Sequence, residues 1–96
     1  MEVARTILEQ LGGNRFMVMT GSSRLVALDN GLGMKLVRNQ SKANYLRIKL
    51  TSMDDYIVEF IKMNTKEMKV VKSFEGVYCD QLQEIFTHAT GLYTSL

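Results

Sequence analysis

Covalent chemistry in this chain would have to use one thiol and one imidazole, because the sequence has a single cysteine and a single histidine. Cys79 and His88 are nine residues apart, and at about 100° per residue this spacing places them on opposite sides of one straight helix. A Cys–His nucleophilic pair needs hydrogen-bond reach. We therefore interpret the thiol as a small apolar group and the imidazole as a surface group.

Carboxylates give two further candidates. Glu84 and His88 have the i, i+4 spacing of two ligands on one helix face, but no second histidine or cysteine completes a zinc shell. Asp54 and Asp55 could serve acid–base work or bind Mg²⁺, yet they fall in an expected hairpin turn, where aspartate is favoured for local hydrogen bonding. We predict no metal, no cofactor and no enzymatic activity.

Two glycines, Gly31 and Gly33, flank Leu32 with the spacing of a phosphate-binding loop. Such loops continue into a Gly-Lys-Ser/Thr sequence or a helix, and neither follows here. We assign this segment to a turn.

The strongest candidate for binding is basic. Tyr45, Arg47 and Lys49 alternate along one face of an expected strand, and Arg38 and Lys42 precede them in a polar connection. Cations interleaved with an aromatic ring on a sheet can follow a phosphate backbone and stack a base. These five residues are the predicted site for an anionic partner. A single tyrosine is a small stacking platform, so an ordinary solvated strand face is the alternative.

Charge is unevenly distributed along the chain, whose net charge is +2. Residues 1–50 carry eight Lys and Arg against three acids, a net of +5, whereas residues 51–96 carry four Lys against seven acids, a net of −3. This asymmetry favours an anionic partner for the first half. The alternative is that the two halves intermix in space and their charges cancel.

Apolar periodicity predicts one helix, an antiparallel meander of about five or six strands, and a second helix. The hairpin over 45–63 should be the centre of the sheet, because both faces of its second arm are apolar. Leu92 and Tyr93 are expected to fold back as a hydrophobic lid. The expected helices are 2–11 and 76–90, and the expected strands are 15–20, 24–28, 32–37, 45–50, 55–62 and 68–74.

This pattern predicts a single α+β domain over residues 1–96, with both helices on one face of the sheet. The other face would be solvated or covered by a partner, or by a second copy in a homodimer. Strands 15–20 and 55–62 are apolar on both faces, and the residues proposed for a protein interface are Met17, Met19, Ile57 and Ile61.

A cytoplasmic location is predicted from three features. No apolar run approaches the roughly 18 residues of a membrane span, so no membrane partner is expected. The N-terminus has polar residues where a signal peptide would be apolar. A lone cysteine agrees with a reducing compartment.

Several segments resemble small hypothetical proteins of tailed phages, prophages and related mobile elements. They are ILEQLGG (7–13), MTG (19–21), SKAN (41–44) and DQLQEIFTHATGLYTSL (80–96), and the likeness extends over almost the whole chain. The resemblance implies a phage-type protein in a bacterial host cytoplasm, and it assigns no functional residue. Small phage proteins of this size are more often binders or inhibitors of host machinery than enzymes.

Two hypotheses follow. The first is a non-enzymatic interaction protein that binds a host or phage macromolecule, with a protein as the expected partner, for example to inhibit a bacterial defence nuclease, through the open sheet face and residues 38–49. The alternative is a small nucleic-acid-binding module that uses the basic strand and loop.

Overall fold

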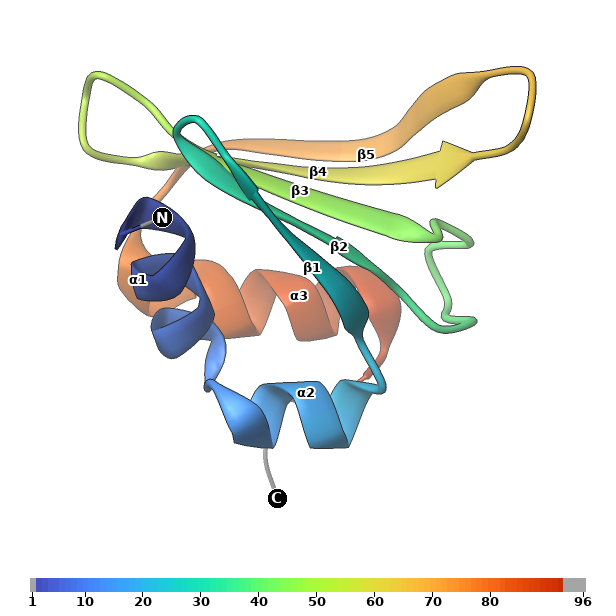
Figure 1. Cartoon of the computed structure of the whole chain (residues 1–96), viewed down its shortest axis with the longest axis horizontal. Coiled ribbons are helices and arrows are strands. Elements are labelled where there is room, and N and C mark those ends of the chain that lie inside the picture. Colours follow the sequence, from blue (N-terminus) through green and yellow to red (C-terminus); the bar gives the residue numbers. More distant parts are fainter. Residues whose placement is uncertain (1, 93–96) are drawn as a thin grey trace.

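The computed structural model describes residues 2–92, and its central element is an antiparallel sheet of five strands (Figure 1). The strands pair in sequence order, β1-β2-β3-β4-β5, which confirms the predicted meander. β4 is flanked on both sides and β5 lies at an edge, as the sequence predicted. Their bounds are Ser23–Leu28 (β1), Gly31–Lys35 (β2), Tyr45–Leu50 (β3), Tyr56–Met63 (β4) and Met68–Val77 (β5).

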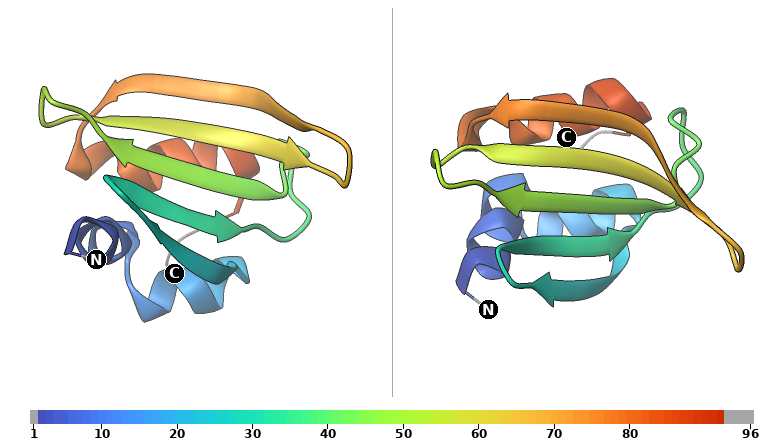
Figure 2. Two further views of the ribbon diagram at one scale, coloured as in Figure 1. Left: turned by 45° about the horizontal axis from the view of Figure 1, so that its top comes forward. Right: turned by 90° about the horizontal axis from the view of Figure 1, so that it is seen from above.

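All the helices lie on one face of this sheet (Figures 1 and 2). They are α1 (Glu2–Leu11), α2 (Asn14–Thr20), the short 3-10 helix η1 (Cys79–Gln81) and α3 (Leu82–Thr90). This arrangement confirms the α+β class, with N-terminal and C-terminal helices packed on the sheet. The lid predicted at Leu92 and Tyr93 extends beyond the described residues. No helix within 2–92 has the length and apolar character needed to cross a membrane.

The strand predicted over 15–20 is wrong, because this segment forms helix α2. Phe16 and Thr20 are buried on one side of the helix, whereas Val18 is 82% exposed. The Thr20 hydroxyl donates to the Phe16 carbonyl over 2.7 Å, and Gly21 ends the helix in the left-handed conformation at φ 68°. A short apolar run does not distinguish a strand from a buried helix by periodicity.

Three boundaries differ from the prediction by two residues or more. β2 ends at Lys35, and β5 continues to Val77, so the C-terminal helical segment begins only at Cys79. Gly31 and Gly33 lie in β2 and not in a turn. The tight turn of this hairpin lies at residues 29–30 instead.

The core lies between the helices and the inner face of the sheet. Alternate residues of β3 and β4 point inward, and they meet one apolar side of each helix. Phe86 of α3 contacts Phe16 of α2 edge to face, with ring centroids 5.0 Å apart, and Phe60 of β4 at 6.3 Å. The fully buried large side chains include Ile7, Leu11, Phe16, Met34, Leu46, Ile48, Phe60, Leu82 and Phe86.

Tyr56, at the start of β4, joins this core to α1. Its side chain is buried, and its hydroxyl donates to the Gln10 Oε1 atom over 2.8 Å. Burial raises the pKa of the Tyr56 phenol, the Gln10 hydrogen bond opposes part of that rise, and the nearby Cys79 adds to it.

The raised pKa of Tyr56 predicts a loss of stability in alkali. The phenol ionises more easily in the unfolded chain, so its contribution to folding is complete below about pH 10 and is lost as pH rises above that value. We expect Tyr56→Phe to flatten the fall in unfolding free energy between about pH 9 and about pH 11, as measured by urea unfolding. Tyr78→Phe, at an exposed position, is the control, and an unchanged slope in Tyr56→Phe would contradict the assignment.

Candidate binding surface at the basic end of the sheet

The meander gathers positive charge at one end of the strands. β1, β3 and β5 begin there and β2 and β4 end there, so segments far apart in sequence lie together (Figure 1). We call residues 21–24, 35–45 and 62–69 the basic end. Its cations are all exposed, and they are Arg24, Lys35, Arg38, Lys42, Lys62, Lys66 and Lys69.

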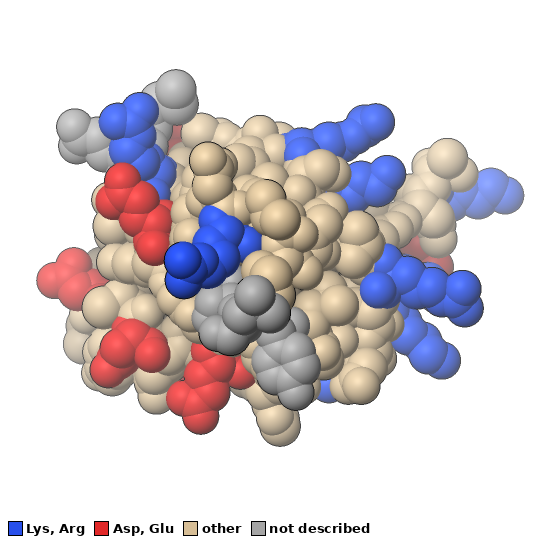
Figure 3. Space-filling model, turned by 90° about the horizontal axis from the view of Figure 1, so that it is seen from below, with Lys and Arg blue, Asp and Glu red and all other residues tan. Residues whose placement is uncertain are grey.

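Glu67 is the one acid within these ranges, so seven cations leave a net charge of +6. The opposite end of the strands comprises residues 28–31, 49–56 and 75–80, which carry five acids against one cation, Lys49. Figure 3, seen from the helix side, shows most Lys and Arg toward one end and most Asp and Glu toward the other, although some basic side chains also lie in the centre and on the acidic half of this face. In space, the charges therefore separate along the direction of the strands, and both halves of the sequence contribute cations to the basic end.

The structure divides the five residues predicted to bind an anionic partner. Arg38, Lys42 and Tyr45 lie at the basic end. Arg47 is engaged in an ion pair, because its Nε atom lies 2.8 Å from Oε1 of Glu59 on β4. Lys49 lies four residues beyond Tyr45 on β3, about 13 Å toward the acidic end. The structure therefore brings Arg38, Lys42 and Tyr45 together and places Arg47 and Lys49 further along β3, and binding of an anionic partner by these five residues stays a prediction.

The sequence analysis also missed five cations of the basic end, which are Arg24, Lys35, Lys62, Lys66 and Lys69. The order of the expected strands already indicated which cations share an end of the sheet, since successive turns of a meander alternate between the two ends. The five cations were missed because basic residues were grouped by their nearness in sequence and not by the end of the sheet to which they belong.

The connecting loop, residues 36–44 between β2 and β3, holds its two cations on a rigid frame. The Asn39 amide donates to the carbonyls of Val37 (2.7 Å) and Ala43 (2.9 Å), and the Ser41 amide donates to Asn39 Oδ1 (3.0 Å). The loop is also tied to α3, because the Gln40 amide donates to the Thr90 carbonyl.

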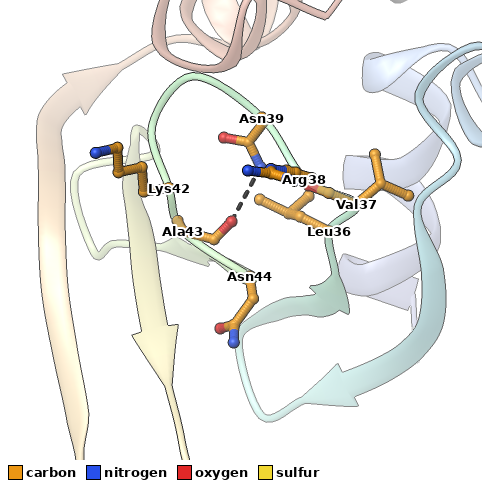
Figure 4. A pocket seen from close by; sticks show the side chains of 7 residues that line it. All are labelled: Leu36, Val37, Arg38, Asn39, Lys42, Ala43 and Asn44. Carbon is orange, nitrogen blue, oxygen red and sulfur yellow. Dashed lines mark hydrogen bonds between the residues drawn. The ribbon is translucent and has the colours of Figure 1, made fainter.

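This loop encloses a pocket of about 480 Å³ that Figure 4 shows in close-up. The Asn39 side chain lies inside it and bonds the loop itself, while Lys42 points away from the other labelled side chains. Lys42 has a φ of 64°, a conformation that the loop's hydrogen bonds hold in place. The polar group inside the pocket is thus used for hydrogen bonds within the loop, whereas the two cations of the loop, Arg38 and Lys42, are exposed at the surface.

A second pocket lies on the open face of the sheet. We call it the tyrosine slot, and it has a volume of about 300 Å³. Its lining residues come from four adjacent strands and the connecting loop: Arg24, Val26, Lys35, Asn44, Tyr45 and Met63. Asn44 fixes one wall, because its amide donates to the Met63 carbonyl and accepts from the Met63 amide, both over 2.8 Å.

The predicted protein interface does not form one surface. Met17 and Met19 belong to α2 in the helix layer, whereas Ile57 and Ile61 belong to β4 and alternate with its core residues. Ile61 is fully buried, so it has no area to offer a partner. The structure therefore does not bring the four residues together, and their role in a protein interface stays a prediction.

The residues considered for chemistry lie in three different segments of the chain. Cys79, in η1, and His88, on α3, are both exposed, and they are not on one continuous α-helix. Asp54 and Asp55 lie in the turn between β3 and β4, where Asp55 accepts a hydrogen bond from the Thr51 hydroxyl. Among residues 2–92, no group of three or more His, Cys, Asp or Glu could hold a metal ion.

No family model, curated protein or solved structure matches the chain. The resemblance to phage proteins therefore stays a prediction.

Proposed function

We propose that this protein is a non-enzymatic binding protein that docks a polyanionic macromolecule on its basic end. The observation that carries the proposal is the gathering of seven exposed cations with a single acid at one end of the sheet. Like charges held together raise the local potential, and a negatively charged partner is attracted to it and steered toward it.

The surface is also held in a defined shape. The connecting loop is fixed by the Asn39 hydrogen bonds, and Asn44 bonds the end of β4 where the β4–β5 hairpin begins. Lys62 and Lys69 are cross-strand partners in that hairpin. A preorganised array of cations loses less conformational freedom on binding than cations on a flexible tail.

The charge separation orients a partner on the molecule. A polyanion is attracted to the basic end and repelled by the five acids of the opposite end. The resemblance to phage proteins further supports a macromolecule of an infected bacterium as the partner, and this part of the proposal rests on that resemblance alone.

The test compares two variants of equal net charge. One carries Lys62→Glu, Lys66→Glu and Lys69→Glu at the basic end, and the other carries Arg5→Glu, Arg15→Glu and Lys49→Glu outside it. Binding of labelled heparin, oligonucleotides and polyglutamate is measured by fluorescence anisotropy at several salt concentrations. We expect the basic-end variant to bind about tenfold more weakly or worse, with a shallower salt dependence.

The control variant should keep most of its affinity, since its substitutions leave the basic end intact. Equal loss of binding in both variants would mean that net charge, and not the basic end, determines affinity. Failure of the unmodified protein to bind any of these polyanions would refute the proposed function.

A further inference from the structure

We propose that the tyrosine slot receives an unpaired nucleobase, so that the polyanion bound at the basic end is a single-stranded nucleic acid. This inference rests on the proposed function and names the class of partner. It depends on the position of Tyr45, and on the apolar walls and the cations beside it.

Tyr45 leans across the sheet because the neighbouring strand has no side chain beneath its ring. A Cβ atom added to Gly33 of β2 would lie 1.9 Å from the Tyr45 hydroxyl oxygen and 2.8 Å from Cζ. Side chains on a strand normally stand perpendicular to the sheet, so the phenol ring occupies the space that Gly33 leaves empty. The half-buried ring is therefore available as a platform for another flat ring.

The other walls suit a flat apolar group. Val26 and Met63 remain 46% and 40% exposed on the two sides of the slot. A nucleobase has two faces that stack on aromatic rings, and a methionine thioether contacts aromatic rings favourably.

Cations lie beside the slot at positions suited to a phosphate backbone. Arg24 of β1 and Lys35 of β2 line it directly. Lys62 and its cross-strand partner Lys69 belong to the same end of the sheet, but side chains alternate along a strand, so Lys62 points to the face opposite that of its neighbour Met63. A nucleic-acid strand that places one base in the slot therefore has Arg24 and Lys35 next to it for a neighbouring phosphate.

The slot selects for unpaired bases and offers little discrimination among them. In a duplex the bases are stacked and paired inside the helix, so none can enter a surface slot without being extruded. Asn44 is the one amide side chain in the lining, and the Met63 backbone engages its oxygen and one of its N–H groups. We expect tight binding of any unpaired sequence, with a modest preference set by stacking strength.

An acidic protein segment is the competing partner. It would neutralise the same cations, but carboxylates offer no flat face to Tyr45 and leave the apolar walls uncovered. The combination of slot and cations therefore favours nucleic acid.

The experiment measures anisotropy of a labelled oligothymidylate, the same backbone without bases, a duplex and polyglutamate. We expect the unmodified protein to bind the base-bearing single strand about tenfold more tightly than the abasic strand. Tyr45→Ala should abolish this difference, while Tyr45→Phe should preserve it. Gly33→Ala, which leaves the tyrosine chemically intact but displaces its ring, should act like Tyr45→Ala. Circular dichroism of each variant verifies that it is folded.

Equal affinity for the abasic and base-bearing strands, or a preference for duplex, would refute the proposal that the tyrosine slot receives a base, while leaving the proposed function intact. Polyglutamate binding as tightly as the oligonucleotide would identify an acidic protein as the partner and also overturn it. The absence of binding to every polyanion would refute both proposals together.

Discussion

Phe86→Ala is expected to lower the free energy of unfolding by about 3–5 kcal/mol, the usual cost of removing a buried phenylalanine. Phe86 is 1% exposed, and its ring lies between Phe16 of α2 and Phe60 of β4. Truncation would remove the aromatic contacts that join α3 to α2 and to the sheet, and would leave a cavity. For a domain of this length, whose whole stability is about 5–15 kcal/mol, that loss decides whether it stays folded at moderate temperature.

Urea unfolding followed by circular dichroism measures this effect. Tyr78→Ala is the matched control, because it removes another aromatic side chain shortly before α3, from a position that is 57% exposed. A change within about 0.5 kcal/mol is typical of such surface sites. A loss below about 1 kcal/mol for Phe86→Ala would show that α3 does not pack on the sheet through this ring.

Most of the fold was predictable because its determinants are local. Leu46, Ile48 and Leu50 alternate with polar residues, and this period of two is sufficient to identify a strand with one buried face. The turn residues Asp29 and Asn30 separate the segments that form β1 and β2. Because the connection between these two strands is so short, they must pair with each other. A chain of hairpins leaves few alternatives to a meander.

The error at α2 arose where local patterns carry no information. Phe16, Met17, Val18 and Met19 form an apolar run that fits a two-sided strand as well as a helix. The tertiary packing decides, since Phe16 reaches the Phe86 ring from a helix that crosses below the sheet. The glycines on either side of the segment were compatible with both outcomes.

The candidate site was harder to predict because it depends on register. Arg47 and Glu59 are twelve residues apart in sequence. The length of the turn between β3 and β4 sets the register that makes them cross-strand partners. Ile61 likewise pairs with Tyr45 and Val70, and it is fully buried outside the main core. Alternation identifies the face on which a residue lies, but not how its neighbours on that face pair with it or cover it.

Gly31→Ala is expected to destabilise the protein by about 3 kcal/mol or more. This loss is much larger than the change of about 0.5 kcal/mol that is typical of surface substitutions, because the new side chain clashes with backbone atoms. A Cβ atom at Gly31 would lie 2.1 Å from the Ile48 carbonyl oxygen and 3.0 Å from the Lys49 Cα atom. Both atoms belong to the backbone of β3, which cannot turn aside as a side chain can. The substitution would therefore separate β2 from the strand that carries Leu46 and Ile48 into the core.

Gly33→Ala provides the matched comparison, because the same substitution two residues further along β2 meets a different obstacle. The atom it approaches is the hydroxyl oxygen of Tyr45, the end of a side chain that can rotate away at modest cost. We expect Gly31→Ala to shift the urea midpoint strongly, and Gly33→Ala to leave the fold nearly as stable while weakening binding of base-bearing strands. A Gly33→Ala variant as unstable as Gly31→Ala would mean that the Tyr45 ring is fixed as firmly as the backbone, so that Tyr45 is a structural residue of the open face and not a platform for a ligand.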